Sequence, residues 1–201
     1  MMDVTIRDAR VEDVRLVSDC VLASVDLYDF IHDSVEKDIA LAVCGMDDTL
    51  YSYRNARVAE VGGMPTGCLV SYDGSIYAEA RKKTFALFKE AGHEMKDSDI
   101  ETGPGEYYID SFAIRPEFRG MGIGHLLLKD AIGKASALGI PRVSLIVEKS
   151  KPDLQRYYSL LGFRPVGEMH AFGDDYVKME AEQAGYNDLM KNSRLSSCGM
   201  S

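Results

Sequence analysis

The chain has 201 residues, 46% of them hydrophobic and 27% charged, which is the composition of an ordinary globular domain rather than of a disordered or fibrous chain. Its formal net charge of −9 argues against a nucleic-acid partner, because phosphate binding needs clustered Lys and Arg, and it suits a cationic substrate. No apolar run approaches the roughly 20 residues that span a bilayer, so we expect a cytoplasmic protein without a membrane partner.

The beginning of the chain predicts a strand followed by two helices. Residues 4–10 (VTIRDAR) have a strand-like composition, and from Asp13 onward valines recur at helical spacing. Segment 26–50 carries a helical pattern in its later part, and the aromatic residues Tyr28 and Phe30 precede that pattern on a loop. These aromatic side chains suit either ordinary packing or the wall of a substrate cleft.

A hairpin and a helical segment come next. The β-type runs 56–61 and 66–72 are separated by residues 62–65 (GGMP), so the sheet is expected to begin antiparallel. Residues 76–91 form an amphipathic helical pattern, and an acidic loop containing Gly and Pro follows it. We interpret 76–105 as a helical insertion within the domain.

The second half of the chain is a dense series of elements. It predicts a strand over 106–114, a loop over 115–124, a helix to about Leu138, a strand over 142–148, a helix over 152–161 and two closing strands, FRPVG and DYVKME. Strand, helix and strand in this order indicate a βαβ unit. Residues 182–201 are polar without a periodic pattern, so we expect one domain over 1–181 and a flexible C-terminal tail.

A glycine-rich loop opens the helix of this βαβ unit. It consists of Arg119, Gly120, Met121, Gly122, Ile123 and Gly124. The glycines let backbone N–H groups approach a ligand, and the helix N-terminus adds a partial positive charge. With Arg119 as a further donor, the loop predicts binding of an anion, most naturally a pyrophosphate.

Three other interpretations of this loop compete. A Rossmann fingerprint needs a third glycine where the chain has His125 or Leu127, depending on the glycine from which the count starts. A Walker loop needs Gly-Lys-Ser or Gly-Lys-Thr, and the sequence contains neither. A glycine-rich turn without any ligand is the third interpretation.

The run from Arg119 to Gly124 resembles the signature (Gln/Arg)-x-x-Gly-x-(Gly/Ala) of the GNAT superfamily of N-acetyltransferases. The resemblance extends through strands 106–114 and 142–148 and through Tyr158…Leu161-Gly162-Phe163, which is similar to the family's LYxxxGF ending. It covers nearly everything except 76–105 and the tail. It implies an α/β fold of the GNAT acyl-CoA N-acyltransferase type, with a mixed, twisted sheet of six or seven strands flanked by helices. The sheet is expected to splay apart near residues 114 and 147.

The resemblance also implies a cosubstrate and its binding residues. Acetyl-CoA would lie in the splay, with its pyrophosphate on the loop and its pantetheine arm along Phe112, Ala113 and Ile114. Backbone groups of Phe112 and Ile114 would pair with that arm, and an N–H there would polarise the thioester carbonyl. Lys151 stands where the family commonly has an asparagine that contacts the coenzyme, and it is our candidate for a phosphate contact.

Catalytic candidates follow from the same resemblance. Tyr158 would face the coenzyme sulfur and meet the departing thiolate, while Tyr157 is expected in the core. Some family members carry a glutamate where this chain has Ile146, and Glu148 is the nearest acid on that strand face. Asp110 is a second candidate for the base that deprotonates the amine, because residues 108, 110 and 112 would share one strand face.

The remaining sequence features limit the functions that are possible. His32, His93, His125 and His170 have no ligand spacing, so we predict no metal, and the four cysteines form no CxxC pair and are expected to be reduced. The acceptor, a small-molecule or peptide amine, is not identified by the sequence, and a homodimer is possible. Two rivals remain: a non-catalytic module that senses acyl-CoA, and an acyltransferase that uses a different acyl-CoA.

Overall fold

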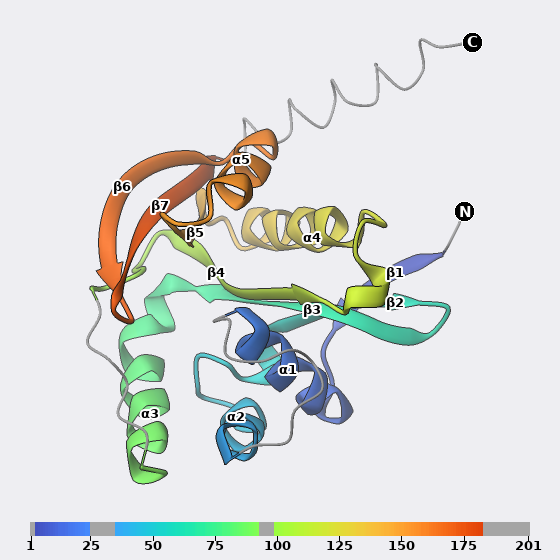
Figure 1. Cartoon of the computed structure of the whole chain (residues 1–201), viewed down its shortest axis with the longest axis vertical. Coiled ribbons are helices and arrows are strands. Elements are labelled where there is room, and N and C mark those ends of the chain that lie inside the picture. The colour runs from blue at the N-terminus through green and yellow to red at the C-terminus, as the bar shows by residue number, and fades with distance from the viewer. Residues whose placement is uncertain (1–2, 25–34, 93–98, 183–201) are drawn as a thin grey trace.

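The computed structural model describes residues 3–24, 35–92 and 99–182, which build a seven-stranded sheet with helices on both faces (Figure 1). The strands are β1 (Val4–Asp8), β2 (Ala56–Val61), β3 (Met64–Asp73), β4 (Glu106–Ile114), β5 (Arg142–Glu148), β6 (Arg164–Ala171) and β7 (Asp174–Glu182). The α-helices are α1 (Val14–Ser24), α2 (Val35–Cys44), α3 (Tyr77–Glu90), α4 (Ile123–Ala137) and α5 (Pro152–Leu160). The predicted α/β fold is confirmed.

The sheet has the strand order β1-β2-β3-β4-β5-β7-β6, and every neighbouring pair except β4 and β5 is antiparallel. The parallel pair β4 and β5 is joined only over residues 106–108 and 142–144. Beyond Tyr108 and Ser144 the two strands part. The predicted splay is therefore present, but it begins about half a strand earlier than residues 114 and 147.

A β-bulge lies in β4 at the start of this splay. Val70 of β3 faces Ser111, whereas the next residue of β3, Ser71, faces Ile109, so Asp110 is an extra residue without a partner on β3. A bulge of this kind reverses the alternation of side chains beyond it. The expectation that residues 108, 110 and 112 share one face is therefore wrong: Tyr108 packs with the helices below the sheet, and Phe112 packs with α4 above it.

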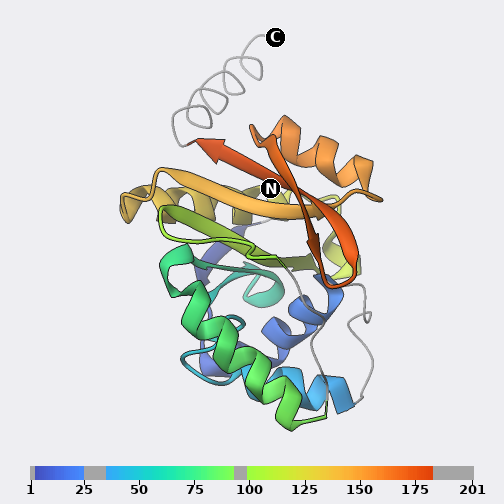
Figure 2. The same cartoon turned by 90° about the vertical axis from the view of Figure 1, so that its left-hand side faces the viewer.

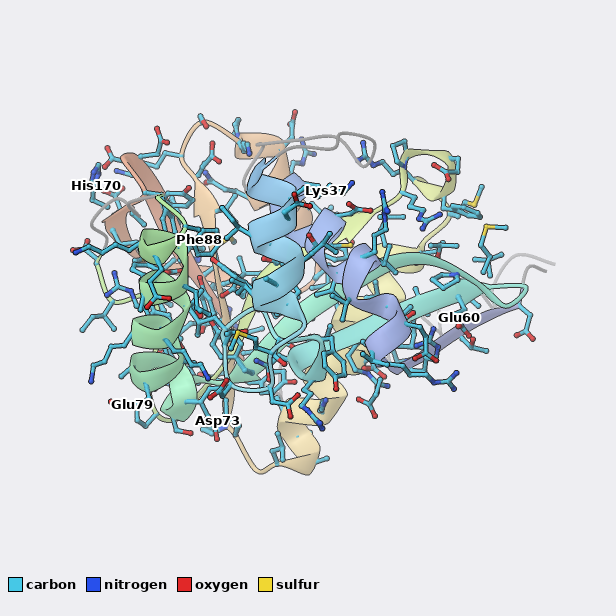
Figure 3. All side chains as sticks on the ribbon, turned by 90° about the horizontal axis from the view of Figure 1, so that it is seen from below. Lys37, Glu60, Asp73, Glu79, Phe88 and His170 are labelled. Carbon is cyan, nitrogen blue, oxygen red and sulfur yellow. The ribbon has the colours of Figure 1, made fainter. Side chains whose placement is uncertain are left out.

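The two faces of the sheet carry separate hydrophobic cores. The upper core joins the sheet to α4 and α5, and the lower core joins it to α1, α2 and α3. Figure 2 shows this three-layer arrangement from the side. Figure 3 looks at the lower face, where Lys37 marks α2 and Glu79 and Phe88 mark α3. The splay between β4 and β5 thus opens between an upper and a lower layer of helices.

Glycine and proline set several element ends. The hairpin between β2 and β3 turns on Gly62 and Gly63 alone, with φ of 58° and 80°, the positive values that a two-residue turn of type I′ requires at both positions. Strand β3 therefore begins at Met64 and not after Pro65 as expected. Helix α5 starts with Pro152, which suits the first helical position because its missing N–H has no helical partner there.

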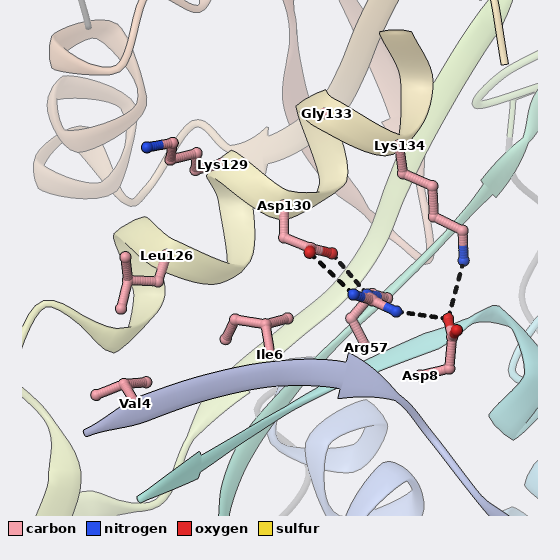
Figure 4. A pocket seen from close by; sticks show the side chains of 9 residues that line it. All are labelled: Val4, Ile6, Asp8, Arg57, Leu126, Lys129, Asp130, Gly133 and Lys134. Carbon is pink, nitrogen blue, oxygen red and sulfur yellow. Dashed lines mark hydrogen bonds and ion pairs between the residues drawn. The ribbon is translucent and has the colours of Figure 1, made fainter. Parts of the chain in front are cut away.

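Ion pairs tie the helices to the sheet and to each other. Arg57 of β2 donates to both carboxylate oxygens of Asp130 on α4, at 2.6 and 2.9 Å, and also pairs with Asp8 of β1 (Figure 4). These residues form one end of a pocket of about 570 Å³ between β1 and α4. On the lower face, Lys37 of α2 pairs with Asp19 of α1 at 3.0 Å. The upper ion pairs thereby fix α4 to the sheet, and the lower one fixes α2 to α1.

Several sequence predictions fall on other parts of the chain. Outside the described residues lie Tyr28, Phe30, His32, His93 and Cys198. The predicted tail also lies outside them, except for Glu182. The predicted helix of the 76–105 insertion is present as α3, and Cys20, Cys44 and Cys68 are buried free thiols. Among the described residues, no helix is long and apolar enough to cross a membrane.

Candidate active site

Backbone groups of Phe112 and Ile114 lie on the edge of β4 that faces the splay. Arg115 N–H donates to Thr66 O of β3 at 2.9 Å, so strand alternation directs the groups of residues 112 and 114 to the opposite edge, away from β3. Two of these backbone groups form hydrogen bonds with side chains of the protein. Phe112 N–H donates to Ser24 Oγ at 2.9 Å, and Arg119 Nε donates to Ile114 O at 3.0 Å.

Ser24 was not a sequence candidate. It is the last residue of α1, and its hydroxyl also donates to Cys20 O one helical turn back at 2.8 Å. Serine at a helix C-terminus carries no motif, so only the packing of α1 under β4 reveals this contact. The Ser24 oxygen lies where an acceptor from outside the protein would have to bind in order to use Phe112 N–H.

The glycine-rich loop has the geometry expected of an anion site. Gly120 and Gly122 both have φ of 77°, and a methyl group added to either would meet no atom within 4 Å. Gly122 is the N-cap of α4, and Leu126 N–H is bonded to Gly122 O, so the N–H groups of residues 123–125 precede the helical ladder. Arg119 to Gly122 are exposed. The residues present fit a diphosphate.

Gly124 has a different role from the other two glycines. It lies in the first turn of α4, and a methyl group there would be 2.8 Å from Cζ of Phe112 and 3.4 Å from the Tyr157 hydroxyl. The absence of a side chain lets the Phe112 ring pack under the helix. Ile123 is 1% exposed and belongs to the upper core. The last two loop residues therefore support the site by packing.

Tyr158 and Tyr157 differ in exposure from what we expected. Tyr158 is 6% exposed and packs against the ring of Phe163 at a centroid distance of 5.7 Å, whereas Tyr157 is partly exposed. Burial raises the pKa of the Tyr158 hydroxyl above its ordinary value. No described residue forms a hydrogen bond with that hydroxyl. Tyr158 is therefore a poor proton donor, although its hydroxyl remains available for a hydrogen bond.

Asp110 lies at the bulge, partly exposed, with two hydroxyl donors. Tyr72 donates to its Oδ2 at 2.6 Å, and Ser111 donates to its Oδ1 at 3.0 Å. Burial and the nearby charge of Glu101 raise the pKa of Asp110 to about 7, although both hydrogen bonds act to lower it. A carboxylate with this pKa accepts and releases protons near neutrality, as a general base must.

Glu148 and Lys151 pair with each other. Lys151 Nζ lies 3.0 Å from Glu148 Oε1, and Ser150 donates to Glu148 Oε2 at 2.9 Å. Glu148 lies on the lower face with Ile146, which packs with the lower core. Its carboxylate is committed to a lysine, which makes it a weaker candidate for the base than Asp110.

A polar group under the narrow end of the splay was also missed. Glu101 is 6% exposed and accepts hydrogen bonds from Tyr77 at 2.9 Å and Tyr108 at 2.7 Å. Burial would raise the pKa of neighbouring Glu106, but hydrogen bonds from Lys178 and Ser144 lower it overall. An acid in a polar loop has no sequence signal that marks it as buried. Among the described residues, no group of three potential ligands is arranged to hold a metal ion.

Solved structures share this fold over most of the chain. A crystal structure of an acetyltransferase is 26% identical with a TM-score of 0.71, covering 89% of this chain and 98% of that one. An N-acetyltransferase from Staphylococcus aureus is 22% identical with a TM-score of 0.73, covering 88% and 100%. The ribosomal-protein alanine N-acetyltransferase from Escherichia coli is 14% identical with a TM-score of 0.57, covering 90% and 94%.

Sequence comparison agrees with the fold. Among curated proteins, none matches the chain at a significant level. The model of the acetyltransferase (GNAT) family matches residues 57–163, which is more than half of the chain and spans β2 to the end of α5. The chain therefore belongs to the GNAT acetyltransferase family, whose members transfer acyl groups and use acyl-CoA as cosubstrate.

Proposed function

We propose that the protein transfers an acetyl group from acetyl-CoA to a primary amine of a small molecule or protein, by direct attack in a ternary complex. The observation that carries this proposal is the position of Asp110. It lies at the bulge where β4 leaves β5, two residues from the outward-facing Phe112 N–H, and its pKa is about 7. A proton acceptor thus lies two residues along β4 from a backbone N–H donor, at the start of the splay.

The backbone of β4 supplies the carbonyl-binding donor. In this proposal the thioester oxygen takes the place of Ser24 Oγ on Phe112 N–H. A donor aimed at the oxygen on which negative charge develops lowers the barrier, and loss of one such donor costs roughly 2.7–4 kcal/mol in other enzymes. The loop around Gly120 and Gly122 would hold the diphosphate at the other end of the cosubstrate.

Asp110 supplies the base. An alkylamine with a pKa of about 10.4 is protonated at neutral pH and must lose a proton before its lone pair can attack. Asp110 would accept that proton, directly or through water, before the attack. As the nitrogen–carbon bond forms and the carbon–sulfur bond breaks, the nitrogen loses a second proton, which passes through water to solvent or to the departing sulfur. The coenzyme thiolate leaves with the electron pair. Tyr158 would donate a hydrogen bond to it without giving up its proton, because burial keeps its pKa high.

The acceptor is proposed from charge. The protein has a formal net charge of −9, and the lower side of the splay carries the carboxylates of Asp110, Glu101 and Glu148. A cationic amine gains from this field. The similar Escherichia coli protein acts on an alanine of a ribosomal protein, so a peptide N-terminus belongs in the same test as small amines.

The test is release of free thiol from acetyl-CoA with a panel of polyamines, amino acids, aminoglycosides and peptide N-termini. Turnover above background hydrolysis, absent when the amine is replaced by the corresponding alcohol, is the expected result. Coenzyme binding without turnover across the panel would instead favour an acyl-CoA sensor. Faster consumption of a longer acyl-CoA would keep the enzyme and change its donor.

A further inference from the structure

Three tyrosines and two acids form a connected group on the lower side of the splay. We call Tyr77, Glu101, Tyr108, Tyr72 and Asp110 the tyrosine–carboxylate cluster. Tyr77 and Tyr108 donate to Glu101, and Tyr72 donates to Asp110. The rings of Tyr72 and Tyr108 are in contact with centroids 5.8 Å apart. The two carboxylates therefore share one enclosure, separated by a pair of packed rings.

Glu101 is held in this enclosure by hydrogen bonds from two tyrosines. Its side chain is buried, and it accepts one tyrosine hydroxyl on each carboxylate oxygen. Burial raises the pKa of Glu101, whereas Tyr108, Tyr77 and the cations Arg81 and Lys178 act to lower it. The hydroxyl donors and cations stabilise the ionised form of Glu101, and the charge of that form raises the pKa of Asp110.

The other groups near Asp110 do not supply the same charge. The titratable groups that interact electrostatically with Asp110 are Tyr72, Tyr108, Tyr51, Cys44 and Glu101. Those that interact with Glu101 are Tyr77, Tyr108, Tyr72, Tyr51, Tyr176, Arg81 and Lys178. Cys20 and Asp19 lie one step further, beside Cys44, and Asp19 is paired with Lys37. The tyrosines and thiols are neutral near pH 7 because burial raises the pKa of Tyr51, Tyr72, Tyr108 and Cys44.

We propose that Glu101 is a positioning residue whose buried negative charge, fixed by Tyr77 and Tyr108, tunes Asp110 as a proton acceptor. Asp110 binds its proton more tightly because a second carboxylate is ionised in the same enclosure. The inference rests on the proposed function only where it concerns catalysis. The electrostatic relation between the two acids holds whether or not Asp110 is the base.

The direct test is titration of the Asp110 side-chain carbon by NMR from about pH 4 to about pH 9. In the unaltered protein, the Asp110 signal should show a second, smaller inflection at the midpoint of Glu101, because interacting acids titrate in two shared steps. In Glu101→Gln, which keeps the size of the side chain, the Asp110 midpoint should fall by about one pH unit. An unmoved midpoint, together with a single inflection in the unaltered protein, overturns the proposal.

Two further variants give matched controls. Tyr72→Phe removes a donor to the Asp110 carboxylate, so the Asp110 midpoint should rise, opposite in direction to Glu101→Gln. Glu79→Gln removes an exposed carboxylate on α3 that pairs with Lys82, and it should leave the midpoint unchanged. A shift of the same sign in all three variants would mean a general loss of structure and would contradict the proposal.

The pH profile of kcat/KM separates this inference from the proposed function. If Asp110 is the base, the acidic limb of the profile should move with the NMR midpoint, downward in Glu101→Gln and upward in Tyr72→Phe. If the NMR midpoint of Asp110 moves and the acidic limb of the kcat/KM profile does not, Glu101 tunes Asp110 but Asp110 is not the base. If both stay, Glu101 does not tune Asp110.

Discussion

The two sides of the splay between β4 and β5 present different kinds of chemical groups, backbone on one side and side chains on the other. On the upper side, the loop from Arg119 to Gly122 presents exposed backbone at the start of α4. On the lower side, the tyrosine–carboxylate cluster presents side chains that are hydrogen-bonded to one another. A backbone site tolerates any side chain that leaves its conformation intact, whereas a side-chain site depends on the chemical identity of each residue. Substitutions should therefore act differently on the two sides.

The largest effect is expected on the lower side, at Asp110. Asp110→Asn removes the proposed base and should lower kcat/KM by about 10²–10⁴-fold, the usual contribution of general base catalysis. With the unaltered protein, kcat/KM should rise with pH through about 7, the pKa of Asp110. Steady-state kinetics across pH measures both. If kcat/KM of Asp110→Asn still rises with pH in the same range, another group is the base.

The same substitution should stabilise the fold. Folded Asp110 keeps its proton up to a pKa of about 7, whereas an unfolded aspartate loses it near about pH 4. Stability from this group is therefore complete below about pH 4 and declines as the pH rises to about 7. Asparagine does not ionise, so above pH 7 Asp110→Asn should gain on the order of 2 kcal/mol, less than the full shift implies because water reaches the carboxylate. Urea unfolding at two pH values measures the difference.

The next largest effect is expected on the upper side, at Gly122. Its φ of 77° costs a side-chain-bearing residue about 1–2 kcal/mol, so Gly122→Ala should distort the loop and weaken coenzyme A binding by about tenfold. Gly133→Ala, in the middle of the same helix, is the matched control. It meets no atom within 4 Å and should leave binding unchanged while stabilising α4 by about 0.5–1 kcal/mol. Calorimetry with coenzyme A compares the two, and equal affinities would exclude the loop as the diphosphate site.

The sequence predicted the upper side of the splay better than the lower side. Local patterns located strands 106–114 and 142–148 and the glycine loop because each is a contiguous run with its own periodicity or spacing. The bulge at Asp110 has no such signal. One extra residue in a strand looks the same as a regular strand in sequence, so the parity argument placed Phe112 on the wrong face. The composition of 106–114 gave the strand but not its register.

The lower side depends on contacts between distant segments. Glu101, Tyr72 and Tyr77 come from a loop, a strand and a helix, and their separations along the chain have no pattern that relates them. The resemblance to a family did identify Tyr158, but not that it would be more buried than Tyr157. Burial is decided by packing against Phe163, which a motif does not record.

A smaller effect is expected where the two sides meet, at Ser24. Ser24→Ala removes the internal acceptor of Phe112 N–H, so a thioester carbonyl no longer has to displace it. Since one hydrogen bond contributes about 0.5–1.5 kcal/mol, acetyl-CoA should bind a few-fold to about tenfold more tightly. Free coenzyme A has no thioester carbonyl and serves as the control ligand. A gain for both ligands, or for neither, would show that Ser24 does not compete with the thioester carbonyl.

The smallest effect is expected at Glu148, the rival base on the lower side. Its carboxylate pairs with Lys151 and accepts a hydrogen bond from Ser150, and such partly exposed pairs contribute about 0–1 kcal/mol. Glu148→Gln should therefore lower kcat/KM by less than about fivefold and leave the pH limb in place, since the limb belongs to Asp110. Kinetics of Glu148→Gln beside Asp110→Asn decides between the two acids. If the order of their effects is reversed, the base belongs to β5, and the bulge in β4 serves only to turn Phe112 under α4.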